Sequence, residues 1–410
     1  MERPVGVFDV TCTPSSRPFQ RVQTNGGQTV MKVGMALNML SQPGRSDSAI
    51  LNEHMQLGDL AEPLGFDSLF ALEHHFTGYA MSPSPLQFLS YYAGRTKRIH
   101  LGTGVIVIPW HDPIRIAEQI ALLDVMCGGR CIFGFGRGAA RVEYEGFRIP
   151  MDEARPRFKE GLDIVKLGLT QASFEYDGEF FKIPRTSIRP APISHPERRF
   201  YGSANSPESA KLIASQGLGL LIVMHNEWSK AAHEVYDFHK YAAEAGHAPK
   251  PPIIVTNVSC AETRAEADDR AVTWLGKKWD SVDNHYRFSD GGLADVKGYE
   301  AYSKIGRTYQ KMSDLTHRQK MTDTYVKIQL VGTPDDCIQQ IAELRTLTGL
   351  DHLVCEFSYG GLPHDESELN LRLFADKVKP VLQSDTLFTQ PAKIVTELPS
   401  YEDTGVFVPA

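Results

Sequence analysis

Residues Ser68–Pro85 read SLFALEHHFTGYAMSPSP, an apolar segment followed by a polar one. The apolar run 69–72 ends abruptly at Glu73, His74 and His75. A buried parallel strand has such a near-continuous apolar sequence. In a barrel of parallel strands, the residues that follow the C-terminal strand ends form the active face. The stretch therefore predicts a strand that delivers a carboxylate and two imidazoles to a functional site.

Apolar strand patterns and amphipathic helix patterns alternate along most of the chain. Eight strands are expected, at 31–38, 68–72, 99–108, 131–135, 200–202, 218–223, 252–259 and 350–357. The expected helices are 49–64, 85–94, 113–126, 153–169, 206–216, 227–245, 263–275, 335–346 and 366–382. Strict alternation indicates parallel strands joined by right-handed crossovers. We therefore predict an α/β protein with a closed (β/α)8 TIM barrel and insertions, among them a hairpin over 174–183.

An open doubly wound sheet is the alternative arrangement of the same elements. That fold would place a Gly-x-Gly-x-x-Gly motif after the first strand, with an acidic residue about 20 positions further on. The first strand is instead followed by Asn38-Met39-Leu40-Ser41. The absence of the motif favours the barrel.

Three segments fall outside this alternation. Residues 1–30 are rich in Pro, Ser, Thr, Gln and Gly, and we expect an N-terminal arm there. The barrel domain then covers 31–383, and 384–410 form a C-terminal extension. Within the barrel, 276–322 is a long polar and aromatic connection, and connections of this length are usually functional or mobile. We predict that it is a mobile active-site loop.

The composition is that of an ordinary globular protein, with 42% hydrophobic residues and a net charge of −7. This charge argues against nucleic-acid and anionic-membrane partners, which require a basic face. No basic and apolar leader and no run of about 18 apolar residues occurs, so we expect a cytoplasmic protein. The cysteines form no paired framework, which favours reduced thiols over a zinc site; they are Cys12, Cys127, Cys131, Cys260, Cys337 and Cys355.

The histidine pair could serve as metal ligands, as acid–base groups or only in packing. Adjacent residues at a strand end point to opposite sides, so His74 and His75 are poor candidates for sharing a metal ion. No metal site is predicted. An imidazole titrates near neutrality and therefore suits proton transfer or hydrogen bonding to a developing charge.

Three further segments, one within a predicted strand and two after predicted strands, are candidates for ligand binding. Gly102 and Gly104 lie inside a strong strand, where they indicate either close strand packing or a flat ligand against the backbone. Arg137 stands between glycines at 134–138, and a guanidinium pairs well with phosphate, although a surface ion pair is the alternative. Ser206 begins a helix whose N-terminus can bind an anion, besides being capped by that serine. Together they predict a phosphate site beside a flat surface.

An ordered set of motifs resembles the bacterial luciferase-like, flavin-dependent monooxygenases over residues 31–382. Individually the motifs are short, but their order and spacing are specific to this superfamily. None of them specifies a substrate. The motifs are Leu72–Thr77, Gly102–Pro109, Leu123-Asp124, Gly129-Arg130, Phe133–Gly138, Ser203–Ser206, Val331–Pro334, and Phe357 followed by Gly360–His364.

The resemblance implies a two-component enzyme that takes reduced FMN, FMNH2, from a separate NAD(P)H:flavin reductase. O2 adds to the flavin to give a C4a-peroxyflavin, which oxidises an organic substrate by hydroxylation or Baeyer–Villiger oxidation. A homodimer is also implied, and the helices at 49–64 and at 85–94 or 113–126 are candidate faces.

The resemblance also implies roles for particular residues. His74 resembles the catalytic histidine and His75 its partner, while Gly104-Val105 resembles a cis peptide under the flavin ring. Bacterial luciferase has a reactive cysteine where this chain has Gly136, which puts light emission in doubt and opens space near the ring. The remaining flavin-binding candidates are Arg137, Ser206 and Ser209 at the phosphate and Asn205 at the isoalloxazine.

Apolar and aromatic residues near the predicted active face favour an uncharged, lipophilic small-molecule substrate such as a terpenoid, ketone or aldehyde. Two other functions stay open: a deazaflavin-dependent hydride-transfer enzyme of the same superfamily, and a non-catalytic flavin- or fatty-acyl-binding relative. The candidate pocket residues are Met35, Leu37, Phe76, Tyr79, Met81, Trp110, Met224 and Trp228.

Overall fold

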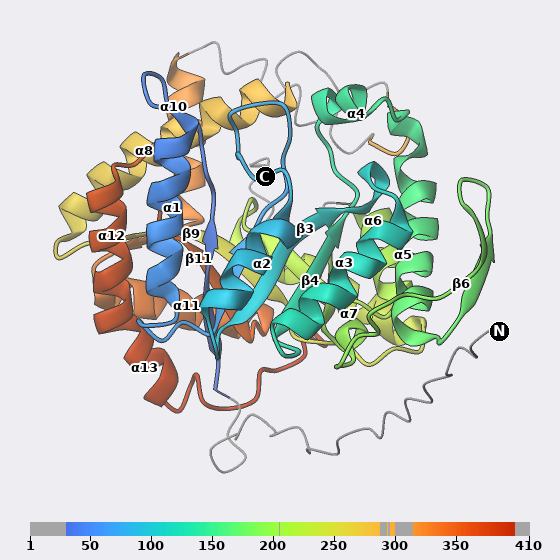
Figure 1. Ribbon diagram of the computed structural model, residues 1–410. Coiled ribbons are helices and arrows are strands. Elements are labelled where there is room, and N and C mark those ends of the chain that lie inside the picture. Colours follow the sequence, from blue (N-terminus) through green and yellow to red (C-terminus); the bar gives the residue numbers. More distant parts are fainter. Residues whose placement is uncertain (1–29, 205, 288–292, 294–295, 300–314, 398–410) are drawn as a thin grey trace, which may run out of the picture.

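Eight parallel strands close into a barrel in the computed structural model, which describes residues 30–204, 206–287, 293, 296–299 and 315–397 (Figure 1). The closed barrel is as predicted, and the open sheet is excluded because the last strand pairs with the first. In order around the barrel the strands are β1 (Lys32–Leu37), β2 (Ser68–Ala71), β3 (His100–Val107), β4 (Cys131–Gly136), β7 (Phe200–Ser203), β8 (Gly219–Val223), β9 (Ile253–Cys260) and β11 (His352–Glu356).

Helices surround the barrel at nearly all the predicted positions (Figure 1). Local sequence explains the start of α3, where the Asp112 side chain accepts from the backbone of Ile114 and Pro113 takes the first helical position. These helices are α1 (Asp47–Ala61), α2 (Pro85–Arg95), α3 (Pro113–Met126), α5 (Ala154–Thr170), α6 (Pro207–Ser215), α7 (Trp228–Glu244), α8 (Arg264–Tyr286), α11 (Pro334–Thr348), α12 (His364–Leu373) and α13 (Lys379–Ser384).

Smaller elements complete the described chain. The predicted hairpin is present: Asp177 pairs with Lys182, and within the loop between them Gly178 donates its N–H to the carbonyl of Phe181. A short strand continues the sheet beside β9 without entering the barrel. These elements are β5 (Phe174–Asp177), β6 (Lys182–Thr186), β10 (Leu330–Gly332), and the helices α4 (Arg141–Phe147) and α10 (Leu315–Lys327).

The core has two layers separated by the strands. One buried cluster fills the barrel interior, and a larger one lies between the strands and the helices. Gly102 belongs to the packing of the interior, because a Cβ there would lie 2.5 Å from the ring of Phe70. The glycine is thus explained by close packing rather than by a ligand. The interior cluster consists of Ala36, Phe70, Ile132, Leu221, Ile253, Val255 and Val354.

Helix α8 is longer than predicted. It runs through 276–286 to Tyr286, where the sequence pattern suggested an end at Leu275, and α10 begins at Leu315 inside the predicted loop. Burial of Trp279 and Val282 stabilises the added turns, which shows tertiary packing overriding a polar local sequence. The segments 288–292, 294–295 and 300–314 of the predicted loop lie outside the described residues.

The described part of the C-terminal extension packs on the barrel. The backbone N–H of Met31 donates to the carbonyl of Phe388 over 2.9 Å, and Phe388 is buried. Arg345 of α11 donates to the carbonyl of Gln390 over 2.6 Å. Residues 1–29 of the predicted arm lie outside the described residues. Among the described helices, none is long and apolar enough to cross a membrane.

Candidate active site

A deep cavity opens at the C-terminal ends of the barrel strands. Residues of β3, β4, β7, β8 and β11 line it, together with the loop after β2 and the inner faces of α8 and α10. Its empty volume is about 1280 Å³, with the open mouth included.

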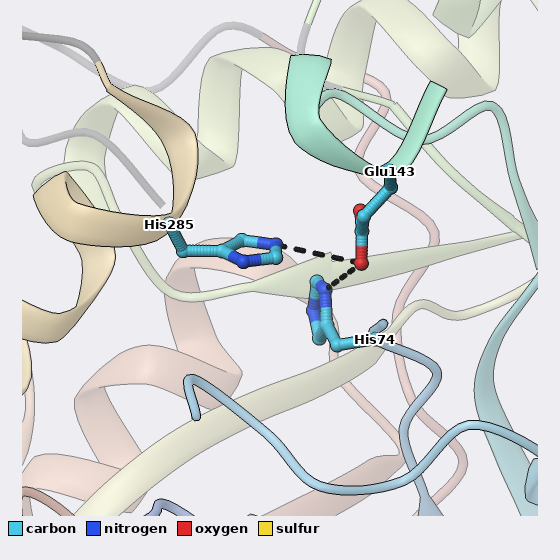
Figure 2. Close-up of side chains that lie close together, drawn as sticks. All are labelled: His74, Glu143 and His285. Atoms are coloured by element: carbon cyan, nitrogen blue, oxygen red, sulfur yellow. Dashed lines mark hydrogen bonds and ion pairs between the residues drawn. The ribbon is translucent and has the colours of Figure 1, made fainter. Parts of the chain in front are cut away.

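His74 lines this cavity and is held by an acidic residue of α4. Figure 2 shows its imidazole beside Glu143, with Nδ1 lying 3.1 Å from the carboxylate oxygen Oε1. The same oxygen accepts from the backbone N–H of His75 over 2.7 Å. The loop after β2 is thereby tied to α4 through one buried carboxylate.

His285 approaches the same carboxylate from α8. Its Nε2 lies 3.5 Å from Glu143 Oε1, which is an ion-pair distance rather than a hydrogen bond (Figure 2). Its Nδ1 lies 2.6 Å from the hydroxyl of Thr77. Both His285 and Glu143 are fully buried. The added turns of α8 therefore complete a cluster that the sequence did not reveal.

The charge of Glu143 fixes the tautomer of His74. Burial alone would raise the pKa of this carboxyl, but interactions with His285 and His74 outweigh burial and lower it to about 2. The carboxylate is therefore ionised at neutral pH and can only accept. His74 Nδ1 must then carry the proton, which leaves Nε2 of the neutral ring with a lone pair.

His75 does not line the cavity. Its Nε2 lies 3.1 Å from the buried Glu73, which also accepts from the backbone N–H of Val107 over 2.8 Å and from the ring of His111. Burial alone would raise the pKa of Glu73, but the bonds from His111 and His75 lower it. The structure places His75 in support of the loop, behind His74.

A glycine-lined surface forms another wall. Gly104, Val105 and Gly136 line the cavity, and the peptide bond between Gly104 and Val105 is cis, as the resemblance implied. A Cβ on Gly136 would lie 2.6 Å from Val105 Cγ2, so this position requires glycine. The backbone is bare here, which suits the face of a planar ligand.

Arg137 and Ser209 lie at this glycine-lined wall. The Arg137 guanidinium donates to the carbonyl of Gly298 over 2.8 Å and stacks on the Tyr299 ring, 3.8 Å from its centre. Arg155 donates to the same carbonyl over 3.3 Å. Guanidinium groups beside a hydroxyl are the donors that a phosphate monoester prefers, so this end of the cavity fits the phosphate of FMN.

Ser206 acts at the start of α6 as its cap. Its hydroxyl accepts from the backbone N–H of Ser209 and lies 3.2 Å from the Ser209 hydroxyl. Ser206 itself does not line the cavity, so its contribution is to orient Ser209. The predicted flavin contact Asn205 lies outside the described residues.

A family model described as luciferase-like monooxygenase matches residues 31–352. The chain belongs to the luciferase-like monooxygenase family. Among curated relatives, the alkanal monooxygenase alpha chain of Photorhabdus luminescens is 28% identical over 359 residues, which cover 86% of this chain and 98% of that protein. The oxygenase component of the flavin-dependent trigonelline monooxygenase of Acinetobacter baylyi is 29% identical over 180 residues, or 43% of this chain and 50% of that protein.

Solved structures give the same fold. Monooxygenase RslO1 from Streptomyces bottropensis superimposes with a TM-score of 0.71 and 25% identity, over 85% of this chain and 99% of that one. An F420-dependent secondary alcohol dehydrogenase shares the fold with a TM-score of 0.65 and 18% identity, over 86% of this chain and 99% of that one. As a member of its family, the protein is a flavin-dependent monooxygenase.

Three of the eight predicted pocket residues, Tyr79, Trp110 and Met224, line the cavity of the monooxygenase. Leu37 does not, because side chains alternate along β1 and it packs outward against α1, in the same outer layer as Met35. Strand alternation, read with the correct phase, would have excluded both of these residues.

The other three predicted pocket residues lie away from the cavity. Phe76 has a positive φ of 64°, which turns its ring outward, and 59% of its surface is exposed. Trp228 donates its indole N–H to the carbonyl of Ile328 over 2.9 Å at the start of α7. Met81 is half-buried in the loop after β2, where its backbone N–H donates to Met39.

Two residues of the site were missed from the sequence. Glu143 lies on a seven-residue helix and is one of 50 acidic residues, so no local signal distinguishes it. His285 did carry a signal, because Leu275, Trp279 and Val282 continue the apolar spacing of a helix toward it. From the sequence, only His74 and His75 are candidates for sharing a metal ion, and they are poor ones. The structure instead brings ligand atoms of His74, Glu143 and His285 within 4.8 Å of one another.

Proposed function

We propose that the monooxygenase is the oxygenase component of a two-component system. It takes reduced FMN from a separate NAD(P)H:flavin reductase and uses O2 to oxidise a lipophilic organic substrate. The observation that carries this proposal is one cavity that joins the Arg137 guanidinium, the bare backbone at Gly104 and Gly136, and the His74 imidazole. Reduced FMN, when bound, supplies the two electrons with which O2 is activated.

Each residue of the proposed site has a separate role. Arg137 and the Ser209 hydroxyl bind the phosphate, with Arg155 as a second cation nearby. Gly104 and Gly136 let the flavin ring lie close to the backbone. His74 presents a lone pair at Nε2, which accepts a hydrogen bond or takes a proton from the reacting centre. Trp110, Met224 and Val282 line the cavity with apolar surface and so limit the access of water.

The test is reconstitution with and without a flavin reductase. Substrate oxidation should require NADH, FMN and the reductase together, and the protein alone should not oxidise NADH. Titration of the same preparation with reduced FMN and with reduced deazaflavin F420 separates the two cofactor classes. Tight F420 binding with hydride transfer under argon would replace the proposal with the deazaflavin alternative. Tight binding of oxidised FMN without any turnover would indicate a binding protein.

Arg137→Ala should weaken binding of reduced FMN by about 10- to 100-fold, the size of a lost hydrogen bond to a charged group. Riboflavin, which lacks the phosphate, should bind the variant and the wild type equally. Anaerobic fluorescence titration measures both dissociation constants. The exposed Arg185→Ala variant is the matched control, and a similar loss there, or an equal loss for riboflavin, would contradict the phosphate role.

We further propose a homodimer formed through α2 and α3. These helices pack side by side and leave apolar side chains exposed at Tyr91, Leu122, Val125 and Met126. An exposed apolar patch of this kind commonly marks a protein–protein interface. The helix at 49–64, the other predicted candidate, corresponds to α1 and has no large apolar side chain among the exposed ones of the described residues.

The double variant Leu122→Glu/Met126→Glu should be monomeric at micromolar concentration. The wild type should have twice the chain mass of 45.6 kDa in light scattering. Two buried like charges on each face would oppose association strongly. Leu369, which is 64% exposed on α12, provides the control variant Leu369→Glu, which should stay dimeric. A monomeric wild type would disprove the dimer.

A further inference from the structure

Two thiols lie in contact beneath the turn that joins α3 to β4. The Sγ atoms of Cys127 and Cys131 are 3.0 Å apart, and both cysteines are free. Cys127 is the C-terminal cap of α3, and Cys131 is the first residue of β4. The pair therefore lies at the N-terminal end of the barrel strands, and neither cysteine lines the cavity at the opposite end.

The direction of the hydrogen bond between the two thiols can be derived. The Cys127 thiol has an acceptor of its own, the carbonyl oxygen of Asp124, at 3.7 Å. For Cys131, the Cys127 sulfur is the acceptor that the described residues offer. Cys131 is therefore the donor within the pair. A donated S–H stabilises negative charge on the accepting sulfur, so the pair favours a thiolate at Cys127.

Arg130 adds a fixed positive charge beside Cys127. Its guanidinium donates to the carbonyl of Cys127 over 2.7 Å and to that of Thr96 over 3.0 Å. The hydrogen bond from Cys131 lowers the pKa of Cys127 to about 7, with help from Arg130 and against the effects of burial and of Asp124. The same interaction, together with burial, raises the pKa of Cys131. Cys127 is thus the nucleophilic member of the pair, because the thiolate is the reactive form of cysteine.

An exposed turn covers the pair and leaves a narrow route to it. Gly128 and Gly129 form this turn with φ values of 67° and 80°. A Cβ at Gly128 would have no atom within 4 Å, so the space outside that residue is open. Cys127 itself is 3% exposed. A molecule as small as hydrogen peroxide fits such a route, whereas a bulky disulfide such as oxidised glutathione does not.

Metal binding does not account for the pair. A structural zinc site needs more ligands than two thiolates. Among the described residues, the side chains grouped closely enough to hold a metal ion are His74, Glu143 and His285, and neither cysteine belongs to that group. Two thiols in mutual contact are instead the arrangement from which a disulfide forms. The S–S bond measures about 2.05 Å, so the sulfur atoms need to approach by roughly 1 Å.

We propose that Cys127 and Cys131 form an oxidation site, a dithiol that hydrogen peroxide converts reversibly into a disulfide between α3 and β4. The thiol chemistry does not depend on the proposed function, but that function provides a source of the oxidant. Reduced flavin that reacts with O2 without oxidising a substrate yields oxidised flavin and hydrogen peroxide. The protein would then meet peroxide whenever its substrate is missing.

The reaction balances in two steps. The Cys127 thiolate attacks one oxygen of hydrogen peroxide, so that an S–O bond forms, the O–O bond breaks and hydroxide leaves. The Cys131 sulfur then attacks the Cys127 sulfur, so that the S–S bond forms, the S–O bond breaks and the second oxygen leaves as water. The two thiols together lose two electrons and two protons. Hydrogen peroxide takes up both and becomes two molecules of water.

The experiment maps tryptic peptides of the full chain, reduced beforehand, with and without added hydrogen peroxide. Remaining thiols are blocked with iodoacetamide before digestion. Trypsin cleaves after Arg130, between the two cysteines, and releases them in peptides 116–130 and 131–137. After oxidation the two peptides should stay joined, with a mass lower than their sum by two hydrogen atoms. Dithiothreitol should separate them again.

Two single variants identify the attacking thiol. Cys131→Ser should stop the reaction at the sulfenic acid of Cys127, which dimedone traps. Cys127→Ser should give at least about tenfold less dimedone adduct at Cys131, because the remaining thiol stays protonated. Cys355→Ser is the matched control, since Cys355 is another buried thiol on a barrel strand, and it should form the bridge as the wild type does.

Three outcomes would overturn the inference. The first is the absence of joined peptides in the peroxide-treated wild type, and the second is a bridge formed by oxidised glutathione but not by peroxide. The third is faster bridging of Cys260 and Cys337, which also interact but whose contact and burial raise the pKa of Cys337. No flavin is present in this experiment, so its failure leaves the proposed function untouched. Failure of the proposed function shows separately, as loss of reduced-FMN binding by the wild type.

Discussion

His74→Ala should reduce the product formed per reduced flavin consumed by at least about tenfold. General acid–base groups commonly accelerate a reaction by a factor of about 10²–10⁴, so a loss of this size is expected. The cause is the loss of the lone pair at Nε2, the ring nitrogen that does not contact Glu143, in a side chain that lines the cavity. Reduced FMN should bind with an unchanged dissociation constant, because the phosphate donors are untouched. Single-turnover assays with a defined amount of reduced FMN measure both quantities.

The control for this variant is His195→Ala. The His195 side chain is 69% exposed, and within the described part of the chain it pairs only with Glu197, so its loss should leave turnover and coupling intact. Unchanged coupling in His74→Ala would remove His74 from the mechanism. Weaker reduced-FMN binding with normal coupling would instead make His74 a flavin-binding residue.

Glu143→Gln should lower the turnover number by about 10- to 100-fold while the flavin dissociation constant changes little. The amide keeps the shape of the side chain but loses the charge that holds the proton on His74 Nδ1. Because the wild-type pKa is about 2, Glu143 stays ionised from neutral pH down to about pH 3, and protonation weakens its hold only as pH falls toward 2. A pH profile of coupled turnover should therefore show no step from this carboxyl above pH 4.

Glu145→Gln is the matched control, since Glu145 is an exposed acid on the same short helix. Its turnover should equal that of the wild type. Metal analysis of both proteins completes the test, because His74, Glu143 and His285 could also bind an ion. A stoichiometric metal that the Glu143→Gln variant loses would contradict the tautomer argument and assign the cluster to metal binding.

The barrel could be predicted because its signals are local. Most strands are short apolar runs, and α2, α3, α6 and α11 begin at a capping side chain followed by proline. Barrel closure follows from strict alternation. The predicted end of α8 at Leu275 was wrong, because the residues after Gly276 are mostly polar and hide the helical spacing of the buried Trp279 and Val282. Only contacts with the rest of the barrel make that segment helical.

The site was predictable where backbone geometry and residue type coincide, as at Gly104, Gly136 and Arg137. It was not predictable where function depends on a distant partner. Glu143 follows His74 by 69 residues, so the pairing leaves no spacing to recognise. The pair was found only once the chain was folded.

The contact between Arg137 and residues 298–299 has a consequence for affinity. A free arginine loses its rotational freedom when it binds phosphate, at a cost of roughly 0.5–1.5 kcal/mol. Here the Gly298 carbonyl and the Tyr299 ring already hold the guanidinium, while Tyr299 is itself anchored to the carbonyl of Gly138 over 2.8 Å. The guanidinium is therefore preorganised. With Arg137 as the proposed phosphate ligand, we expect part of the affinity for the flavin phosphate to depend on a segment about 160 residues away in the sequence, which would not need to touch the phosphate at all.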